Sequence, residues 1–470
     1  MKQKKHSPSD LVRFMESPFS SWMDQYVLKF PEISQLKDAQ DPLTNILQLK
    51  GLAHEHQLEE GFKEQGLSLI KVEGKDDIEK ERATLSAMKR GVDVIAQARL
   101  EMNGFMGYAD FLIKVDGASN LGHFHYEVWD TKLSKHLKPS YIIQLCCYAE
   151  MLEMMQGVRP QTIVVVLGNG EKKKLRTNDC FQYYLGLKQS FLSAQADFDP
   201  NNRPDPADFK AWGAWSTYAQ TVLIEKDHLF QIANITRAQI KKLNKSEILT
   251  LQHLVDTDLP RIPGINESIF QNLKKQADIQ KKSQGQLKPC YQVVIPKEGD
   301  RQGLALLPPH SPLDLFFDIE GFPLHEGGLE YLWGCTYFNE WGERVFKDFW
   351  AHNREEEKQA FQDFIHWAYN RWLKDPSMHI YHYANYEIAA CRKLMGRFGV
   401  CEEEVDQLLR NEVFVDLYKI VKGSILIGEP RYSIKNIERL YRDKRNTEVG
   451  SGGDSVVVYE KWRELHEIGR

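Results

Sequence analysis

The pattern of apolar and polar positions changes twice along the chain. From residue 8 to about 190, runs with helical spacing alternate with short β-branched runs, which predicts a mixed α/β core. From about 225 to 285 the spacing is helical throughout, with a Pro263-Gly264 turn between two segments. From residue 313 onward, three strand-like runs, a long helix, another strand and further helices predict a second α/β unit.

This pattern predicts three domains, at 1–205, 206–300 and 301–470. A length of 470 residues agrees with that number, and a polar stretch rich in Lys and Pro marks the second boundary near 285–305. The middle domain resembles a helix-hairpin element whose turn amides can face a phosphate. A small helical linker explains the same pattern. The basic run KKKLR at 172–176 is predicted to be a solvated turn.

Composition excludes several classes of protein. The chain is 42% hydrophobic and 27% charged, as in ordinary globular proteins, and its apolar runs are too short to span a bilayer. No secretory signal follows the basic N-terminus, so we predict a cytoplasmic protein without a membrane partner. The net charge of -5 neither requires nor excludes nucleic acid. The seven cysteines form no CxxC pair, so their spacing predicts no structural zinc site.

One strand carries an unusual pair of charges. Asp130 and Lys132 are two residues apart in the apolar run YEVWDTKL, so they share one face of a strand. Folding the preceding hairpin about residue 119 places Asp110 opposite roughly residue 128, beside Asp130. Such a pair is usually part of a solvated strand face, but neighbours such as Trp129 make this a poor surface strand. Paired carboxylates at the end of a sheet suit Mg²⁺ or Mn²⁺, which polarises a phosphodiester while the lysine stabilises the developing anion.

Four motifs in order resemble the RecB-like group of PD-(D/E)XK nucleases. They are GLAHE at 51–55, GYAD at 107–110, DTK at 130–132 and QLCCY at 144–148. The resemblance implies a restriction-endonuclease-like mixed sheet. It also assigns the site residues: His54 or Glu55 as the helical ligand, Asp110 and Asp130 as metal ligands, Lys132 as the catalytic lysine, and Gln144 and Tyr148 as a helix pair near the substrate. Some members bind an iron-sulfur cluster through an upstream cysteine, and because Cys146 is the first cysteine here, no cluster is expected.

A second strand repeats the arrangement. Asp318 and Glu320 lie two residues apart in LFFDIEGF, which resembles the first motif of DEDD exonucleases of the ribonuclease H-like fold. By that resemblance Glu387 takes the second acidic position and Asp416 is a further metal ligand. The last Asp of that family has no candidate after YEKWRELHEIGR. We therefore expect either a chain that is truncated relative to its relatives or an impaired second site.

The order of these parts resembles the bacterial RecB-like putative nuclease family. The resemblance implies a Mg²⁺- or Mn²⁺-dependent exonuclease that hydrolyses single- or double-stranded DNA in repair, recombination or the degradation of foreign DNA. The resemblance also allows RNA as a substrate and a superfamily 1 helicase as a partner. No Walker motif is present, so no ATPase is expected in this chain. The alternative is a catalytically weak nucleic-acid-binding module that positions DNA for a helicase or repair partner.

Overall fold

The computed structural model describes residues 5–299, 301–443 and 452–467. The chain divides into two compact units, Met1–Val222 and Leu223–Arg470, and each is described by itself. Among the described residues, no helix has the length and apolar character needed to cross a membrane. The helical segment that begins near residue 225 and the second α/β region both belong to the second unit.

The first unit is built on a six-stranded sheet whose strands lie in chain order. Its central strands pair antiparallel from β2 to β4, whereas β4 and β5 are parallel. The edge strand β1 is parallel to β2, and the edge strand β6 is antiparallel to β5. The bounds are β1 (Leu69–Lys71), β2 (Val94–Met102), β3 (Phe105–Ser119), β4 (Gly122–Lys132), β5 (Thr162–Leu167) and β6 (Lys172–Arg176).

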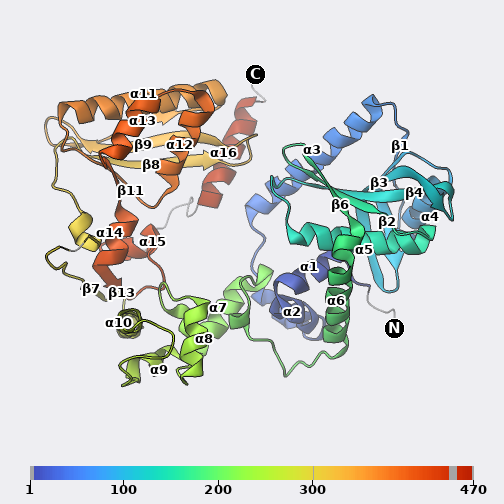
Figure 1. The fold of residues 1–470 in the computed structure, drawn as a ribbon, viewed down its shortest axis with the longest axis horizontal. Helices are drawn as coiled ribbons and strands as arrows, with labels where there is room; N and C mark the ends of the chain where they lie inside the picture. The colour runs from blue at the N-terminus through green and yellow to red at the C-terminus, as the bar shows by residue number, and fades with distance from the viewer. Residues whose placement is uncertain (1–4, 300, 444–451, 468–470) are drawn as a thin grey trace. The chain divides into compact units, whose positions relative to one another are not determined.

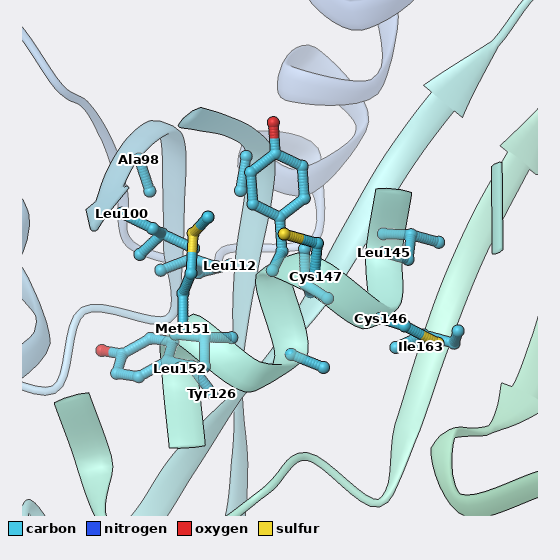
Figure 2. Close-up of a cluster of buried hydrophobic side chains, with 14 of the residues drawn as sticks. Ala98, Leu100, Leu112, Tyr126, Leu145, Cys146, Cys147, Met151, Leu152 and Ile163 are labelled. Carbon is cyan, nitrogen blue, oxygen red and sulfur yellow. The ribbon is translucent and has the colours of Figure 1, made fainter. Parts of the chain in front are cut away.

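Helices cover both faces of this sheet. On one face, α5 (Pro139–Gln156) packs its buried side chains against the strands, and Figure 2 shows Met151 and Leu152 near Leu100 and Leu112. On the other face, Phe62 of α3 (Pro42–Glu64) contacts Phe111 and Trp129 edge to face. The remaining α-helices are α1 (Pro8–Glu16), α2 (Pro18–Lys29), α4 (Asp77–Lys89) and α6 (Thr177–Ala196), and α7 (Ser216–Glu225) runs across the boundary at Val222.

Two expectations for this unit are wrong in detail. The basic run at 172–176 is not a turn but the strand β6, in which partly buried Lys173 and Leu175 alternate with exposed residues. An edge strand pairs with only one neighbour and is often charged, so the polar composition of this run did not indicate a strand. The hairpin turn also lies about one residue later than predicted. Phe111 pairs with Trp129, and the same register places Asp110 opposite Asp130 rather than opposite residue 128.

The first part of the second unit is helical, as the spacing predicts. Its core includes Leu243, Leu254 and Phe270, which come from three different helices. Gly264 has φ +80, a conformation that favours glycine, in the turn that precedes the last of these helices. The helices are α8 (Arg237–Lys245), α9 (Leu251–Asp256) and α10 (Glu267–Ser283). Beyond them, β7 (Tyr291–Val293) pairs with β13 (Ile425–Ile427).

A five-stranded sheet in the order β10-β9-β8-β11-β12 forms the rest of the second unit. Strand β9 is antiparallel to both of its neighbours, and β11 is parallel to β8 and β12. The strands are β8 (Leu315–Phe322), β9 (Leu329–Phe338), β10 (Arg344–Trp350), β11 (Ile380–His382) and β12 (Phe414–Asp416). The helices are α11 (Arg354–Lys374), α12 (Tyr386–Phe398), α13 (Glu402–Arg410), α14 (Leu417–Ser424), α15 (Ile434–Ile437) and α16 (Gly452–Glu467).

The two faces of this sheet are different. Phe317 and Ile319 of β8 pack with Phe361 and Phe364 of α11 in a hydrophobic core, and Figure 1 shows α11 and α13 over that side of the sheet. Because side chains alternate along a strand, the residues between them lie on the opposite face. Phe316, Asp318 and Glu320 are accordingly exposed or half-buried.

Two candidate carboxylate sites

The first site lies where β4 ends. Asp130 is 1% exposed, and Lys132 Nζ lies 2.7 Å from its Oδ2 atom. Burial raises the pKa of the Asp130 carboxyl to about 8; the charge of Asp110 adds to this rise and Lys132 opposes it. The two side chains that the sequence placed on one strand face therefore form a buried ion pair.

Asp110 is fixed to the same end of the sheet by Thr131. The Thr131 backbone N–H donates to Asp110 Oδ2 at 2.8 Å, and its hydroxyl donates to the same oxygen at 3.1 Å. The hairpin thus brings Asp110 to Asp130 and Lys132, as the sequence predicted. Thr131, which holds Asp110 in place, was not identified from the sequence, although it lies inside the DTK motif.

Glu55 reaches this cluster from α3. Burial raises the pKa of its carboxyl to about 7, and the charge of Asp110 adds to the rise. Gln97 Nε2 donates a hydrogen bond of 2.8 Å to Glu55 Oε2. The neighbouring His54 Nε2 is buried and has no hydrogen-bond partner within the described residues. Of the two residues left open by the sequence, Glu55 is the one whose carboxyl is affected by the charge of Asp110.

Gln97 was missed by the sequence analysis. Its backbone has φ +52 in the middle of β2, where a non-glycine residue is strained. The available signal was a lone amide in the apolar run VIAQARL. A polar amide in an apolar strand needs a hydrogen-bond partner. The structure identifies that partner as Glu55.

The helix pair Gln144 and Tyr148 lies beside the cluster. The Tyr148 hydroxyl donates to the Tyr108 carbonyl oxygen at 2.7 Å. Burial raises the Tyr148 pKa, a hydrogen bond with Gln144 opposes the rise, and the charges of Asp130 and Asp110 add to it. Gly107 faces the Tyr148 ring so closely that a Cβ would lie 2.8 Å from it. The glycine of GYAD is therefore explained by this close approach.

The second site joins β8 to the start of α12. Desolvation by the surrounding side chains raises the pKa of the Asp318 carboxyl to about 7, although the residue keeps part of its surface exposed, and the charges of Glu387 and Glu320 add to the rise. Glu387 is 3% exposed, and His382 Nδ1 lies 3.4 Å from its Oε2 atom. The structure therefore brings together Asp318, Glu320 and Glu387, the three carboxylates expected from the sequence.

Glu320 also contacts α16. The Ser455 hydroxyl donates to Glu320 Oε2 at 3.0 Å and is bonded to the Tyr331 hydroxyl at 2.5 Å. Tyr331 stacks on Tyr459 with 3.8 Å between ring centroids. Asp454 lies beside Ser455 in the first turn of this helix, and the sequence analysis did not identify it. The sequence predicts that the last acidic motif of the family is missing at the end of YEKWRELHEIGR. Residues 468–470 of this segment lie outside the described residues, so that prediction is not tested.

Two further acidic residues near this site have different surroundings. Asp416 Oδ1 accepts from the N–H groups of Ala384 and Tyr418, so it caps α14. Glu330, which the sequence analysis missed, is 3% exposed and accepts from the Tyr386 hydroxyl at 2.7 Å and from Lys393 at 2.8 Å. Through these contacts Asp416 stabilises the start of α14, whereas Glu330 holds Tyr386, the residue before Glu387.

The comparison with protein families gives the class of the second site. Residues 315–468 match the model of the RNase H superfamily. This part of the chain is an RNase H-like domain, in agreement with the sheet order and the carboxylates on its first strand. The match indicates a nuclease-like role in nucleic-acid processing. No curated protein matches the chain.

Proposed function

We propose that the protein is a Mg²⁺- or Mn²⁺-dependent nuclease with one carboxylate site in each unit, and that the first site is of the PD-(D/E)XK type. One observation carries the proposal for the first unit: the Asp130–Lys132 ion pair beside Asp110 at the end of a mixed sheet. A buried pair with an adjacent like charge costs free energy, and a function explains why it is kept. The match to the RNase H superfamily supports the proposal for the second unit.

The donor sets fit a hard divalent cation. Glu55, Asp110 and Asp130 offer only oxygen atoms, and the pKa values of Glu55 and Asp130 are raised first by desolvation and then by the neighbouring charge of Asp110. Mg²⁺ and Mn²⁺ prefer such ligands, and the same holds for Asp318, Glu320 and Glu387. A bound cation would supply Lewis-acid polarisation of the scissile phosphodiester.

The remaining groups of the first site have complementary roles. Lys132 is positively charged and 23% exposed, so it can face a phosphate and stabilise the negative charge that develops on it. Gln144 lies on the next helix and would contact the substrate.

The open face of the second sheet favours a single-stranded substrate. Phe316 stacks on Tyr381 with 5.4 Å between centroids, while Phe346 and Trp350 are 63% and 49% exposed. The register places Phe316 and Phe346 on either side of Thr336, on the face that carries Asp318. Exposed aromatic rings beside a nuclease site can stack on unpaired bases of any sequence.

The test compares one variant of each site. Full-length protein, Asp130→Asn and Asp318→Asn are incubated with linear and circular, single- and double-stranded DNA and RNA, with Mn²⁺ or with chelator. We expect cleavage of DNA that chelator abolishes, with at least a hundredfold loss in the variant whose site cuts that substrate. Equal cleavage by both variants and the parent protein would show that the sites are wrongly placed.

Exonucleolytic cleavage, a role in DNA repair and a helicase partner are parts of the same proposal. The substrate panel decides the first, because an exonuclease leaves circular DNA intact. If the protein binds DNA in a salt-sensitive way and cuts none of the substrates with Mg²⁺ or Mn²⁺, it is instead a binding module.

A further inference from the structure

Outside both carboxylate sites, three side chains of different chemistry meet between α11 and α13. His366 comes from α11, and Cys401 and Glu404 come from the start of α13. One ligand atom of each lies within 4.8 Å of the others. The helices that carry them cover the sheet face opposite to Asp318 and Glu320, so this cluster is separate from the proposed nuclease site.

The distances suit a zinc ion. In a tetrahedral site, Zn–S of about 2.3 Å and Zn–N of about 2.0–2.1 Å place the sulfur and nitrogen about 3.6 Å apart. Cys401 Sγ and His366 Nε2 are 3.6 Å apart. Glu404 Oε1 lies 3.9 Å from the same nitrogen, so a small side-chain movement completes a three-residue ligand set.

The backbone at Cys401 is consistent with a ligand role. Cys401 precedes α13 with φ +56, a conformation that is costly for residues other than glycine. It occupies the N-cap position, yet its side chain makes no capping hydrogen bond. The thiol is therefore turned to His366 rather than to the helix it precedes.

We propose that His366, Cys401 and Glu404 bind Zn²⁺, which links α11 to α13. A thiolate and an imidazole select Zn²⁺ over the hard Mg²⁺ and Mn²⁺ that the carboxylate sites prefer. Cys401 and Glu404 follow His366 by 35 and 38 positions along the chain. The spacing of cysteines alone therefore predicts no zinc site.

Cobalt provides a readout that the carboxylate sites cannot give. Full-length reduced protein is titrated with Co²⁺ in excess Mg²⁺, and a sulfur-to-cobalt charge-transfer absorption is measured. We expect one equivalent of this absorption in the parent protein and in the control Cys290→Ser, whose thiol lies elsewhere and contacts the Lys282 carbonyl oxygen. We expect its loss in Cys401→Ser. Absorption that persists in Cys401→Ser, or that is absent from the parent protein, overturns the proposal.

A second measurement uses Zn²⁺ itself. Alkylation of Cys401 by iodoacetamide, followed by mass spectrometry, should slow at least tenfold when Zn²⁺ is added to the parent protein. His366→Gln should remove this protection, and because the His366 side chain is 50% exposed, this variant should fold even if Cys401→Ser does not. A thiol that only donates to His366 would react at the same rate with and without Zn²⁺, and that result refutes the site.

Discussion

Gln97 Nε2 donates to Glu55 Oε2 at 2.8 Å from a backbone held at φ +52. A strained residue in the centre of a strand is thus the partner of the glutamate that α3 brings to the first site. The strain and the hydrogen bond have opposite effects on stability, which makes them separable by substitution.

We predict that Gln97→Gly is more stable than Gln97→Ala. Both variants lose the hydrogen bond to Glu55, but only glycine relieves the positive φ, worth about 1–2 kcal/mol in the free energy of unfolding. Urea denaturation of both proteins measures the difference. Both should also need more Mn²⁺ for half-maximal cleavage than the parent protein does, and equal stability of the two variants would show that the backbone relaxes without glycine.

The hydroxyl of Thr131 should matter for metal affinity. Thr131→Val keeps the shape of the side chain and the backbone bond to Asp110 but removes the 3.1 Å hydroxyl bond. A loss of about 1 kcal/mol in binding corresponds to a roughly fivefold lower affinity for Mn²⁺. The Mn²⁺ concentration needed for half-maximal cleavage should rise by the same factor. Thr177→Val is the matched control, because the Thr177 hydroxyl is buried without a hydrogen-bond partner among the described residues.

The stability of the metal-free protein should fall as pH rises. The pKa of the Asp130 carboxyl is about 8 in the folded protein and about 4 when unfolded, so the folded state binds the proton more tightly. Its contribution to stability is complete below about pH 4 and is lost as pH rises to about 8. Thermal unfolding in chelator should show a smaller loss between pH 6 and 8.5 in Asp130→Asn than in the parent protein. An identical pH dependence in both would contradict the raised pKa.

Asp416 tests the boundary between capping and metal binding. Asp416→Asn keeps an oxygen that can accept from Ala384 and Tyr418, whereas Asp416→Ala removes it. We expect Asp416→Ala to lower the free energy of unfolding by about 1 kcal/mol and Asp416→Asn to leave both stability and cleavage nearly unchanged. A large loss of cleavage in Asp416→Asn alone would assign the carboxylate to the metal after all.

The sequence was most informative where chemistry and strand period coincide. Asp130 and Lys132 were placed on one face because alternation along a strand is strict, and Asp318 and Glu320 followed from the same rule. Thr131 was missed because its role depends on a hydrogen bond across the hairpin to Asp110, and such a bond depends on a register that one residue of error changes.

Contacts between segments that are distant in the chain could not be predicted from the sequence. Ser455 reaches Glu320 over 135 positions, and His366 meets Cys401 over 35. No local spacing encodes either meeting, because both depend on how whole helices pack on a sheet. Gln97 is intermediate: its unusual position in an apolar strand was visible, but its partner on α3 was not.

The basic strand β6 has a consequence for self-association. It forms one edge of the first sheet, where free backbone groups could accept a strand from another molecule. Four of its five residues are Lys or Arg, and those at 172, 174 and 176 are exposed. A second copy that approached this edge would bring like charges together, so the lysines protect the sheet from growing into an aggregate.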